Sequence, residues 1–244
     1  MFKGCFCVPR ATTPAEYKQP AGADADDFPG HARLKSNSSR SMSILGNLVK
    51  EFEGSVWESY EQVPGAKLGR GAGGEVVEAS HKKTQRKYAV KIINISNPKY
   101  HTLIENERLI LQDLDHLNCV RLYEVYSIGL TQMWFVMELC TGGHLGQHIA
   151  ARSRGFLSEK NARNLATQLV SVVAHCHERK ICHRDVKLAN ILMESKTRDA
   201  SLKLIDFGNS SRFKKGVLMK RIAGTTYSTA PEVNLTAWLL LHLS

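Results

Sequence analysis

The sequence has no apolar run as long as the roughly 18 residues that a membrane-spanning helix requires. Its first 20 residues also lack the apolar core of a secretory signal peptide. Cysteine is sparse, with 6 among 244 residues, and its spacing shows no pairs of the kind found in disulfide frameworks. Free thiols are typical of a reducing compartment. We therefore expect a cytoplasmic chain without membrane attachment.

The sequence also has no EF-hand. The acidic cluster at residues 24–27 is followed by Pro29 where a calcium loop needs glycine and by Lys35 where it needs glutamate. We interpret the cluster as a solvated acidic patch and expect no direct calcium binding. Cys5 and Cys7 resemble acylated N-termini, but residue 2 is phenylalanine, which excludes glycine-dependent myristoylation from this start. We expect an unmodified tail here, with acylation as the alternative.

Positive charge is concentrated in one part of the chain. The formal net charge is +10, yet the first 59 residues carry equal numbers of basic and acidic side chains. Residues 1–45 are rich in alanine, proline, glycine, aspartate and serine and show no hydrophobic period. We predict a largely disordered N-terminal extension over residues 1–59. The basic remainder fits a nucleic-acid partner or a ligand that carries phosphate.

From Tyr60 onward the pattern changes to that of a folded domain, in which strands come before helices. We predict antiparallel strands at 74–79 and 87–93, a helix at 101–116 and a buried strand at 132–140. Ser158 can cap a long helix in which apolar side chains recur at helical spacing. This order of elements indicates an α+β fold in two lobes.

A glycine-rich segment at 68–76 reads LGRGAGGEV and matches the pattern G-x-G-x-x-G-x-V. Glycines allow backbone amides to approach phosphate groups closely. A dinucleotide-binding fold would place this pattern between a strand and a helix. Here a predicted strand follows the pattern, so we reject the dinucleotide interpretation and expect another kind of phosphate-binding loop.

Lys91 lies in the apolar segment YAVKI, where burial of an unpaired ammonium group would be costly. The predicted helix at 101–116 supplies a partner, because Glu107 fills a step of the apolar stripe of that helix. Glu105 lies off this stripe and is expected to face solvent. We therefore predict a buried ion pair between Lys91 and Glu107, and a snorkelling lysine at the edge of the sheet is the alternative.

Three further motifs follow in order. Residues 183–190 read HRDVKLAN, residues 206–208 read DFG and residues 230–232 read APE. Each motif is weak alone, but with the glycine-rich segment and Lys91 they form a five-part set whose order makes chance coincidence negligible. On these residues the chain resembles a protein kinase, and the resemblance covers about residues 60–233.

Among kinases the sequence is most similar to the calcium-dependent protein kinases of the calmodulin-kinase group. Four segments carry this resemblance: ERLILQDLDHLN at 107–118, RLYEVY at 121–126, FVMELCTGGHL at 135–145 and MESKTRDASLKLIDFG at 193–208. The resemblance implies the two-lobe kinase fold, with an antiparallel-sheet N-lobe and a helical C-lobe. It also implies a serine/threonine kinase that uses ATP and Mg²⁺ and acts on protein substrates, not on nucleic acid.

The resemblance also implies a catalytic role for five residues. Asp185 would orient the substrate hydroxyl and accept its proton, and Lys187 two residues later is typical of serine/threonine kinases. Lys91 would hold the α- and β-phosphates and would itself be held by Glu107. Asn190 completes this catalytic set.

The same resemblance implies the metal and nucleotide ligands. Asp206 and Asn190 would bind Mg²⁺, and His183 would pack under Phe207 without acting as a base. The implied ATP-binding residues are Leu68, Gly69, Gly71, Gly74, Val76, Ala89, Lys91, Met137, Glu138, Cys140 and Leu192.

The sequence departs from the family pattern at several positions. Gly73 stands in place of an aromatic residue, and Asn209 stands in place of an apolar one. Residues 207–231 contain basic side chains and no acid. We expect this segment to be mobile unless it is phosphorylated, and Ser210 and Ser211 are the candidate positions.

The largest departure is at the end of the sequence. Residues 234–244 read NLTAWLLLHLS, a divergent apolar tail in place of the further C-lobe helices of the family. We therefore expect a kinase domain over residues 60–233 with an incomplete C-lobe. The alternative to an active kinase is a truncated, kinase-like module that binds nucleotide with little or no catalytic activity.

Overall fold

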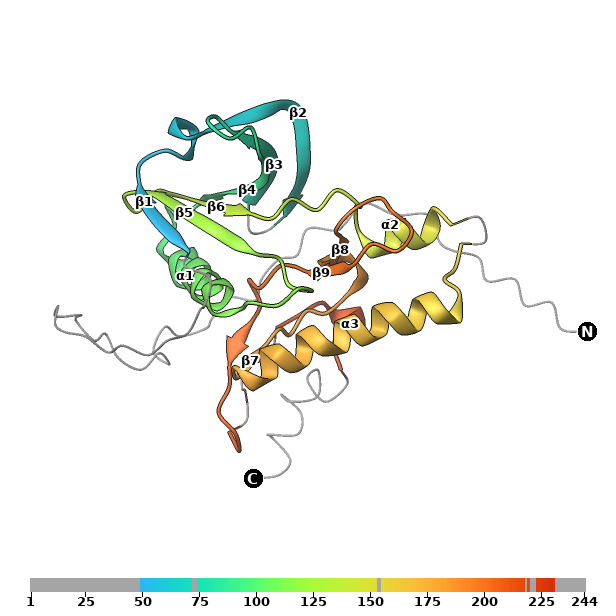
Figure 1. Cartoon of the computed structure of the whole chain (residues 1–244). Coiled ribbons are helices and arrows are strands. Elements are labelled where there is room, and N and C mark those ends of the chain that lie inside the picture. Colours follow the sequence, from blue (N-terminus) through green and yellow to red (C-terminus); the bar gives the residue numbers. More distant parts are fainter. Residues whose placement is uncertain (1–48, 72–73, 153–154, 218, 220–222, 231–244) are drawn as a thin grey trace, which may run out of the picture. The chain divides into compact units, whose positions relative to one another are not determined.

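The computed structural model describes residues 49–71, 74–152, 155–217, 219 and 223–230 (Figure 1). Several sequence predictions lie outside these residues: the calcium-loop and acylation predictions near the N-terminus, the effect of Gly73, the motif residues Pro231 and Glu232, and the apolar tail at 234–244. Within the described residues, strands dominate the first half and helices come later, as predicted for an α+β fold.

A six-stranded sheet has the strand order β1-β5-β6-β4-β3-β2. Its strands are β1 (Lys50–Glu53), β2 (Tyr60–Gly71), β3 (Gly74–His81), β4 (Lys87–Asn94), β5 (Leu122–Ile128) and β6 (Gln132–Met137). The predicted antiparallel pairing of β3 with β4 is confirmed, and β2, β5 and β6 continue that pattern. β1, however, pairs with β5 in parallel, so the antiparallel sheet expected for the N-lobe is mixed at this edge.

Strand β1 and the 3₁₀ turn η1 (Val56–Glu58) both fall within the predicted disordered extension. That prediction is wrong for residues 49–59. Val56 is fully buried, and the ring of Phe52 stacks on Tyr126 with 4.8 Å between ring centroids. Burial of such side chains stabilises an ordered segment. The parallel pairing is possible because a long stretch of chain connects β1 to β5, whereas a tight hairpin joins only antiparallel strands.

Apolar clusters lie on both faces of the sheet. In β6, Met133 and Phe135 belong to one cluster and alternate with Trp134 and Val136, which belong to the other. Alternate residues of a strand point to opposite faces, so the two clusters lie on opposite sides. The cluster that contains Val56 is covered by the segment before β2, and the larger cluster continues into the helical part of the chain.

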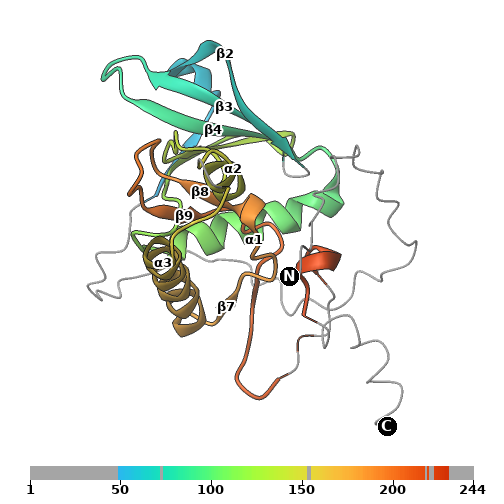
Figure 2. The same cartoon turned by 90° about the vertical axis from the view of Figure 1, so that its right-hand side faces the viewer.

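The helix predicted at 101–116 is present as α1 (Pro98–Asp113), which begins and ends three residues earlier than predicted and runs along one side of the sheet (Figure 2). It begins at a proline, a residue that fits the first turn of a helix because its missing N–H has no partner there. The predicted cap of the long helix is also confirmed. The Ser158 Oγ accepts a hydrogen bond of 3.3 Å from the Asn161 N–H at the start of α3 (Glu159–Glu178).

The remaining elements are short. They are α2 (Leu145–Ala150), β7 (Ile181–Cys182), η2 (Leu188–Asn190), β8 (Ile191–Met193), β9 (Leu202–Leu204), β10 (Ser211–Arg212) and η3 (Thr226–Ser228). β8 pairs with β9 and β7 with β10, and these two small antiparallel sheets carry the HRD and DFG motifs at their ends. Across the described ranges, no helix combines the length and the apolar character needed to cross a membrane.

Candidate active site

Lys91 on β4 and Glu107 on α1 form the ion pair that the sequence predicts. The Lys91 Nζ lies 2.6 Å from the Glu107 Oε1, and the two side chains are only 11% and 5% exposed. The ammonium group also lies 5.9 Å from the centre of the Phe135 ring. Each charge is therefore buried with the other as its partner, which makes the pair sensitive to removal of either side chain.

Several predicted nucleotide-binding residues share one face of the sheet. Val76 pairs with Lys91, and Ala89 pairs with Met137. Residues that pair directly across strands, and residues two apart in one strand, point to the same face. Since Glu107 meets Lys91 on this face, the four side chains lie on the side of the sheet that faces α1. The register thus brings together residues that are far apart in sequence.

The glycine-rich segment forms the turn from β2 to β3. Gly69 pairs with Val76 and Gly71 with Gly74, and the two residues at the tip lie outside the described ranges. Gly74 has φ +121, and a Cβ placed there would lie 2.1 Å from the carbonyl oxygen of Ile92. Only glycine fits this position. Leu68 precedes the turn and is half exposed.

We expect Gly74→Ala to lower the free energy of unfolding by about 1–3 kcal/mol, because it adds backbone strain and a clash with a neighbouring strand. Gly69→Ala is the matched control, since no atom lies within 4 Å of its Cβ position. It should change the free energy of unfolding by about 0.5 kcal/mol or less. Urea unfolding of both variants measures the difference, and equal effects would contradict the prediction.

Asp185 is the centre of a hydrogen-bonded cluster and is only 4% exposed. Its Oδ1 accepts a bond of 2.7 Å from the Thr225 hydroxyl, and its Oδ2 accepts bonds of 3.0 Å from the Lys187 Nζ and 3.1 Å from the Asn190 Nδ2. Burial acts to raise the pKa of Asp185, but the bonds from Thr225 and Lys187 outweigh it and hold the pKa below its usual value. Asp185 is therefore ionised at neutral pH.

The DFG segment is held close to this cluster. Phe207 is fully buried, and its ring lies 4.7 Å from the ring of His183, as predicted. The His183 Nε2 lies 3.0 Å from the carbonyl oxygen of Ile205, and burial lowers the pKa of this imidazole. A neutral His183 that donates to a backbone carbonyl has a structural role. Asp206, with φ 64, accepts a bond of 3.3 Å from the Gly208 N–H.

Asn190, at the end of η2, and Asp206, after β9, are the two side chains that the sequence predicts as metal ligands. The Asn190 Nδ2 donates to both the backbone and the side chain of Asp185, which leaves the Asn190 amide oxygen as the atom able to bind a cation. Asp206 supplies carboxylate oxygens. Within the described residues there is no group of three or more histidine, cysteine or acidic side chains that could hold a metal ion by itself. An amide oxygen and a carboxylate are ligand types that suit Mg²⁺, which takes few protein ligands and shares its other positions with phosphates and water.

Glu138, directly after β6, is tied to the small β8–β9 sheet. Its Oε1 lies 2.6 Å from the Lys203 Nζ, and its backbone N–H donates to the Arg121 carbonyl oxygen at 2.9 Å. Burial raises the pKa of Cys140, two residues later, to about 12, so this thiol is not reactive at neutral pH. Leu192 lies in β8 opposite Lys203.

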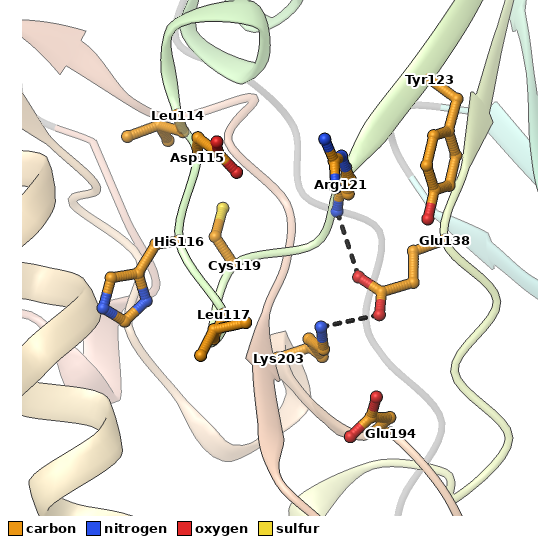
Figure 3. Close-up of a pocket in the computed structure, with 10 residues that line it drawn as sticks. All are labelled: Leu114, Asp115, His116, Leu117, Cys119, Arg121, Tyr123, Glu138, Glu194 and Lys203. Carbon is orange, nitrogen blue, oxygen red and sulfur yellow. Dashed lines mark hydrogen bonds and ion pairs between the residues drawn. The ribbon is translucent and has the colours of Figure 1, made fainter. Parts of the chain in front are cut away.

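A pocket of about 270 Å³ lies beside this ion pair (Figure 3). It is lined by Leu114, Asp115, His116, Leu117, Cys119, Arg121, Tyr123, Glu138, Glu194 and Lys203. Figure 3 shows Glu138 between Lys203 and the Arg121 backbone. Both oxygens of this carboxylate therefore have partners within the chain.

Sequence reasoning missed two residues of the site. Thr225 bonds to Asp185 and also accepts a bond of 2.6 Å from the Lys187 Nζ. No local pattern marks Thr225, because its partners lie far upstream in the sequence. Lys203 lies between two leucines in the short strand β9, in the same kind of apolar surroundings that marked Lys91. This pattern could have identified Lys203 as a buried lysine that needs an acidic partner.

The prediction that Ser210 is open to phosphorylation is wrong for this conformation. Ser210 is 2% exposed, and its hydroxyl donates to the His183 carbonyl oxygen at 3.3 Å. The Asn106 side chain on α1 donates to the Ser210 carbonyl oxygen at 3.0 Å, which fixes the backbone as well. Ser211 is half-buried in β10, so its phosphorylation stays a prediction.

We expect the free energy of unfolding to fall as the pH drops from about 7 to about 5. Burial lowers the pKa values of His116, His175 and His183 below 6.5, and the Arg179 charge adds to the effect for the first two. The unfolded chain therefore binds protons in this pH window that the folded chain does not bind. The histidine contribution to the free energy of unfolding is present above pH 6.5 and is lost as the pH falls through the lowered pKa values. Melting temperatures at a series of pH values test this. The His116→Gln, His175→Gln double variant should show a shallower dependence, and an unchanged slope would contradict the assignment.

Comparison with known proteins independently supports the resemblance to protein kinases. Residues 63–236 match the family model of the protein kinase domain. The chain is 38% identical over 167 residues to calcium-dependent protein kinase 5 of Plasmodium berghei, an alignment that covers 68% of this chain and 29% of that protein. It is also 38% identical over 168 residues to calcium/calmodulin-dependent protein kinase type IV of Mus musculus, covering 69% and 35%. The chain thus spans about a third of the length of these relatives.

Proposed function

The chain belongs to the protein kinase family, and on this premise we propose that it transfers the γ-phosphoryl group of ATP to serine or threonine residues of protein substrates. The cluster around Asp185 is the observation that carries the proposal. It combines an ionised carboxylate with a lysine 3.0 Å away and a candidate metal ligand 3.1 Å away. Phosphoryl transfer needs positioned groups of this kind more than covalent chemistry.

Each residue of the proposed site has a distinct task. Asp185 orients the substrate hydroxyl and accepts its proton, and Lys187 neutralises charge on the phosphoryl group as it is transferred. Lys91 binds the α- and β-phosphates in the position that Glu107 fixes. ATP supplies the phosphoryl group, and Mg²⁺ held by Asp206 and Asn190 would neutralise the phosphate oxygens.

The proposed nucleotide site uses one face of the sheet. The backbone of Gly69, Gly71 and Gly74 would cover the phosphates. The adenine ring would lie among Leu68, Val76, Ala89, Met137 and Leu192, next to the backbone of Glu138 and Cys140. The free thiols of Cys119, Cys140, Cys176 and Cys182 support a cytoplasmic location for this chemistry.

A radiolabel transfer assay tests the proposal. The purified chain is incubated with γ-labelled ATP, Mg²⁺ and paired peptides that differ only in a serine, threonine or tyrosine acceptor. We expect label on the serine and threonine peptides and little on the tyrosine peptide. Binding of ATP without transfer to any peptide would contradict the proposal and favour a nucleotide-binding module.

A further inference from the structure

The segment at residues 49–59 precedes the range that matches the kinase family, yet it is firmly attached to the sheet. β1 pairs in parallel with β5, from Lys50 opposite Glu124 to Glu53 opposite Ser127. The Gly54 N–H then donates to the Ser127 carbonyl oxygen at 2.9 Å, and Val56 is fully buried. These contacts hold β1 on the sheet independently of its contacts with α1.

From this edge, Glu51 reaches α1. Its carboxylate forms an ion pair with Arg108, and its Oε1 accepts a bond of 2.7 Å from the Gln112 Nε2. Arg108 also pairs with Glu105 and donates to the Gln112 Oε1 at 3.2 Å. The Arg108 side chain is 14% exposed and that of Glu51 is 56% exposed, so the network is shielded from solvent on the Arg108 side only. One polar network thus joins the edge strand to the helix that carries Glu107.

The network and the buried ion pair hold α1 on two sides. Glu107 and Arg108 are consecutive, so their side chains are about 100° apart around the helix axis. Glu107 meets Lys91 on β4, whereas Arg108 meets Glu51 on β1. β1 and β4 are three strand spacings apart in the sheet, about 14 Å. A rotation of α1 that takes Glu107 away from Lys91 therefore also displaces Arg108 relative to Glu51.

We propose that Glu51 is a positioning residue. Through Arg108 and Gln112 it holds α1 in the rotation at which Glu107 pairs with Lys91. The inference rests on the proposed function, because the Lys91–Glu107 pair matters through nucleotide binding and transfer. It adds a residue outside the matched kinase range to the set that supports catalysis.

Glu51→Lys places a cation against Arg108 and tests the proposal. We expect kcat/KM for ATP to fall by about threefold to tenfold, the effect of losing and reversing one partly shielded ion pair. Glu53→Lys on the same strand is the matched control, with the same charge change at an exposed position, and should stay within about twofold. Glu51→Gln keeps an acceptor oxygen for Gln112 and should retain most of the activity. Equal effects of Glu51→Lys and Glu53→Lys would overturn the proposal.

A double-mutant cycle separates positioning from general stability. If Glu51 acts through Glu107, then Glu51→Lys should cause little further loss of activity in a Glu107→Gln chain. A full, independent loss in that background would overturn the proposal. If the wild-type chain transfers no phosphate, the proposed function fails. The affinities of the same variants for ATP with Mg²⁺ are then measured in place of their transfer rates. Equal affinities of the wild type and Glu51→Lys would then overturn this inference on its own.

Discussion

Replacing Asp185 by asparagine is expected to lower the rate of phosphoryl transfer by about 10²–10⁴-fold, the contribution of a positioned general base. The reason is local. Asp185 is ionised, buried and oriented by Thr225, Lys187 and Asn190. An asparagine of the same shape can keep part of the hydrogen-bond network but cannot accept the proton of a substrate hydroxyl. Single-turnover transfer rates at saturating ATP measure this step directly.

Two comparisons make the Asp185→Asn result specific. Asp199→Asn makes the same chemical change at an exposed position in the turn between β8 and β9, and it should leave the transfer rate within about twofold of wild type. The affinity of the Asp185→Asn chain for ATP with Mg²⁺ should remain close to that of the wild type. An Asp185→Asn chain with wild-type turnover would rule out the assigned role of this carboxylate.

Lys91→Met is expected to lower the free energy of unfolding by about 3–5 kcal/mol, because it leaves the carboxylate of Glu107 buried without its cation. It should also weaken the binding of ATP, since the proposed phosphate ligand is lost. Lys87→Met on the same strand is the control. Lys87 pairs with Glu78, but its side chain is 59% exposed, so the cost there should be about 1 kcal/mol or less. Chemical unfolding curves of the two variants provide the comparison.

A double variant then separates stability from function. Lys91→Met combined with Glu107→Met replaces a buried ion pair by apolar side chains, a change that is often neutral or stabilising. We expect the double variant to recover most of the stability lost by Lys91→Met while transfer remains abolished. Recovery of transfer together with stability would show that the pair only supports the fold.

The part of the site that could be predicted depends on strong local patterns. A lysine inside an apolar strand and a glutamate on the apolar stripe of a helix each require a buried partner of opposite charge. Those two patterns predicted the contact of Lys91 with Glu107 before the strand register was known. The cap at Ser158 was predictable for the same reason, because its only requirement is a few adjacent residues.

The parts that were missed depend on contacts between distant segments. The sequence KEFE of β1 contains three charged residues and only one apolar residue, and its partner strand lies about 70 residues later. Nothing within β1 therefore distinguishes it from the polar tail before it. Thr225 lies 40 residues from Asp185 in sequence, and only the folded backbone brings its hydroxyl to that carboxylate.

The two edge strands of the sheet bear on whether copies of the chain associate with one another. An unpaired strand edge recruits further strands, and proteins prevent this with short, charged or interrupted edge strands. β1 is short and carries Lys50, Glu51 and Glu53, and β2 on the other edge contains Pro64 within a stretch of irregular pairing. A chain that began at residue 60 would lose β1 and leave the backbone groups along that edge of β5 unpaired. Such a shortened chain should aggregate during expression, whereas a chain that keeps residues 49–59 should remain dispersed.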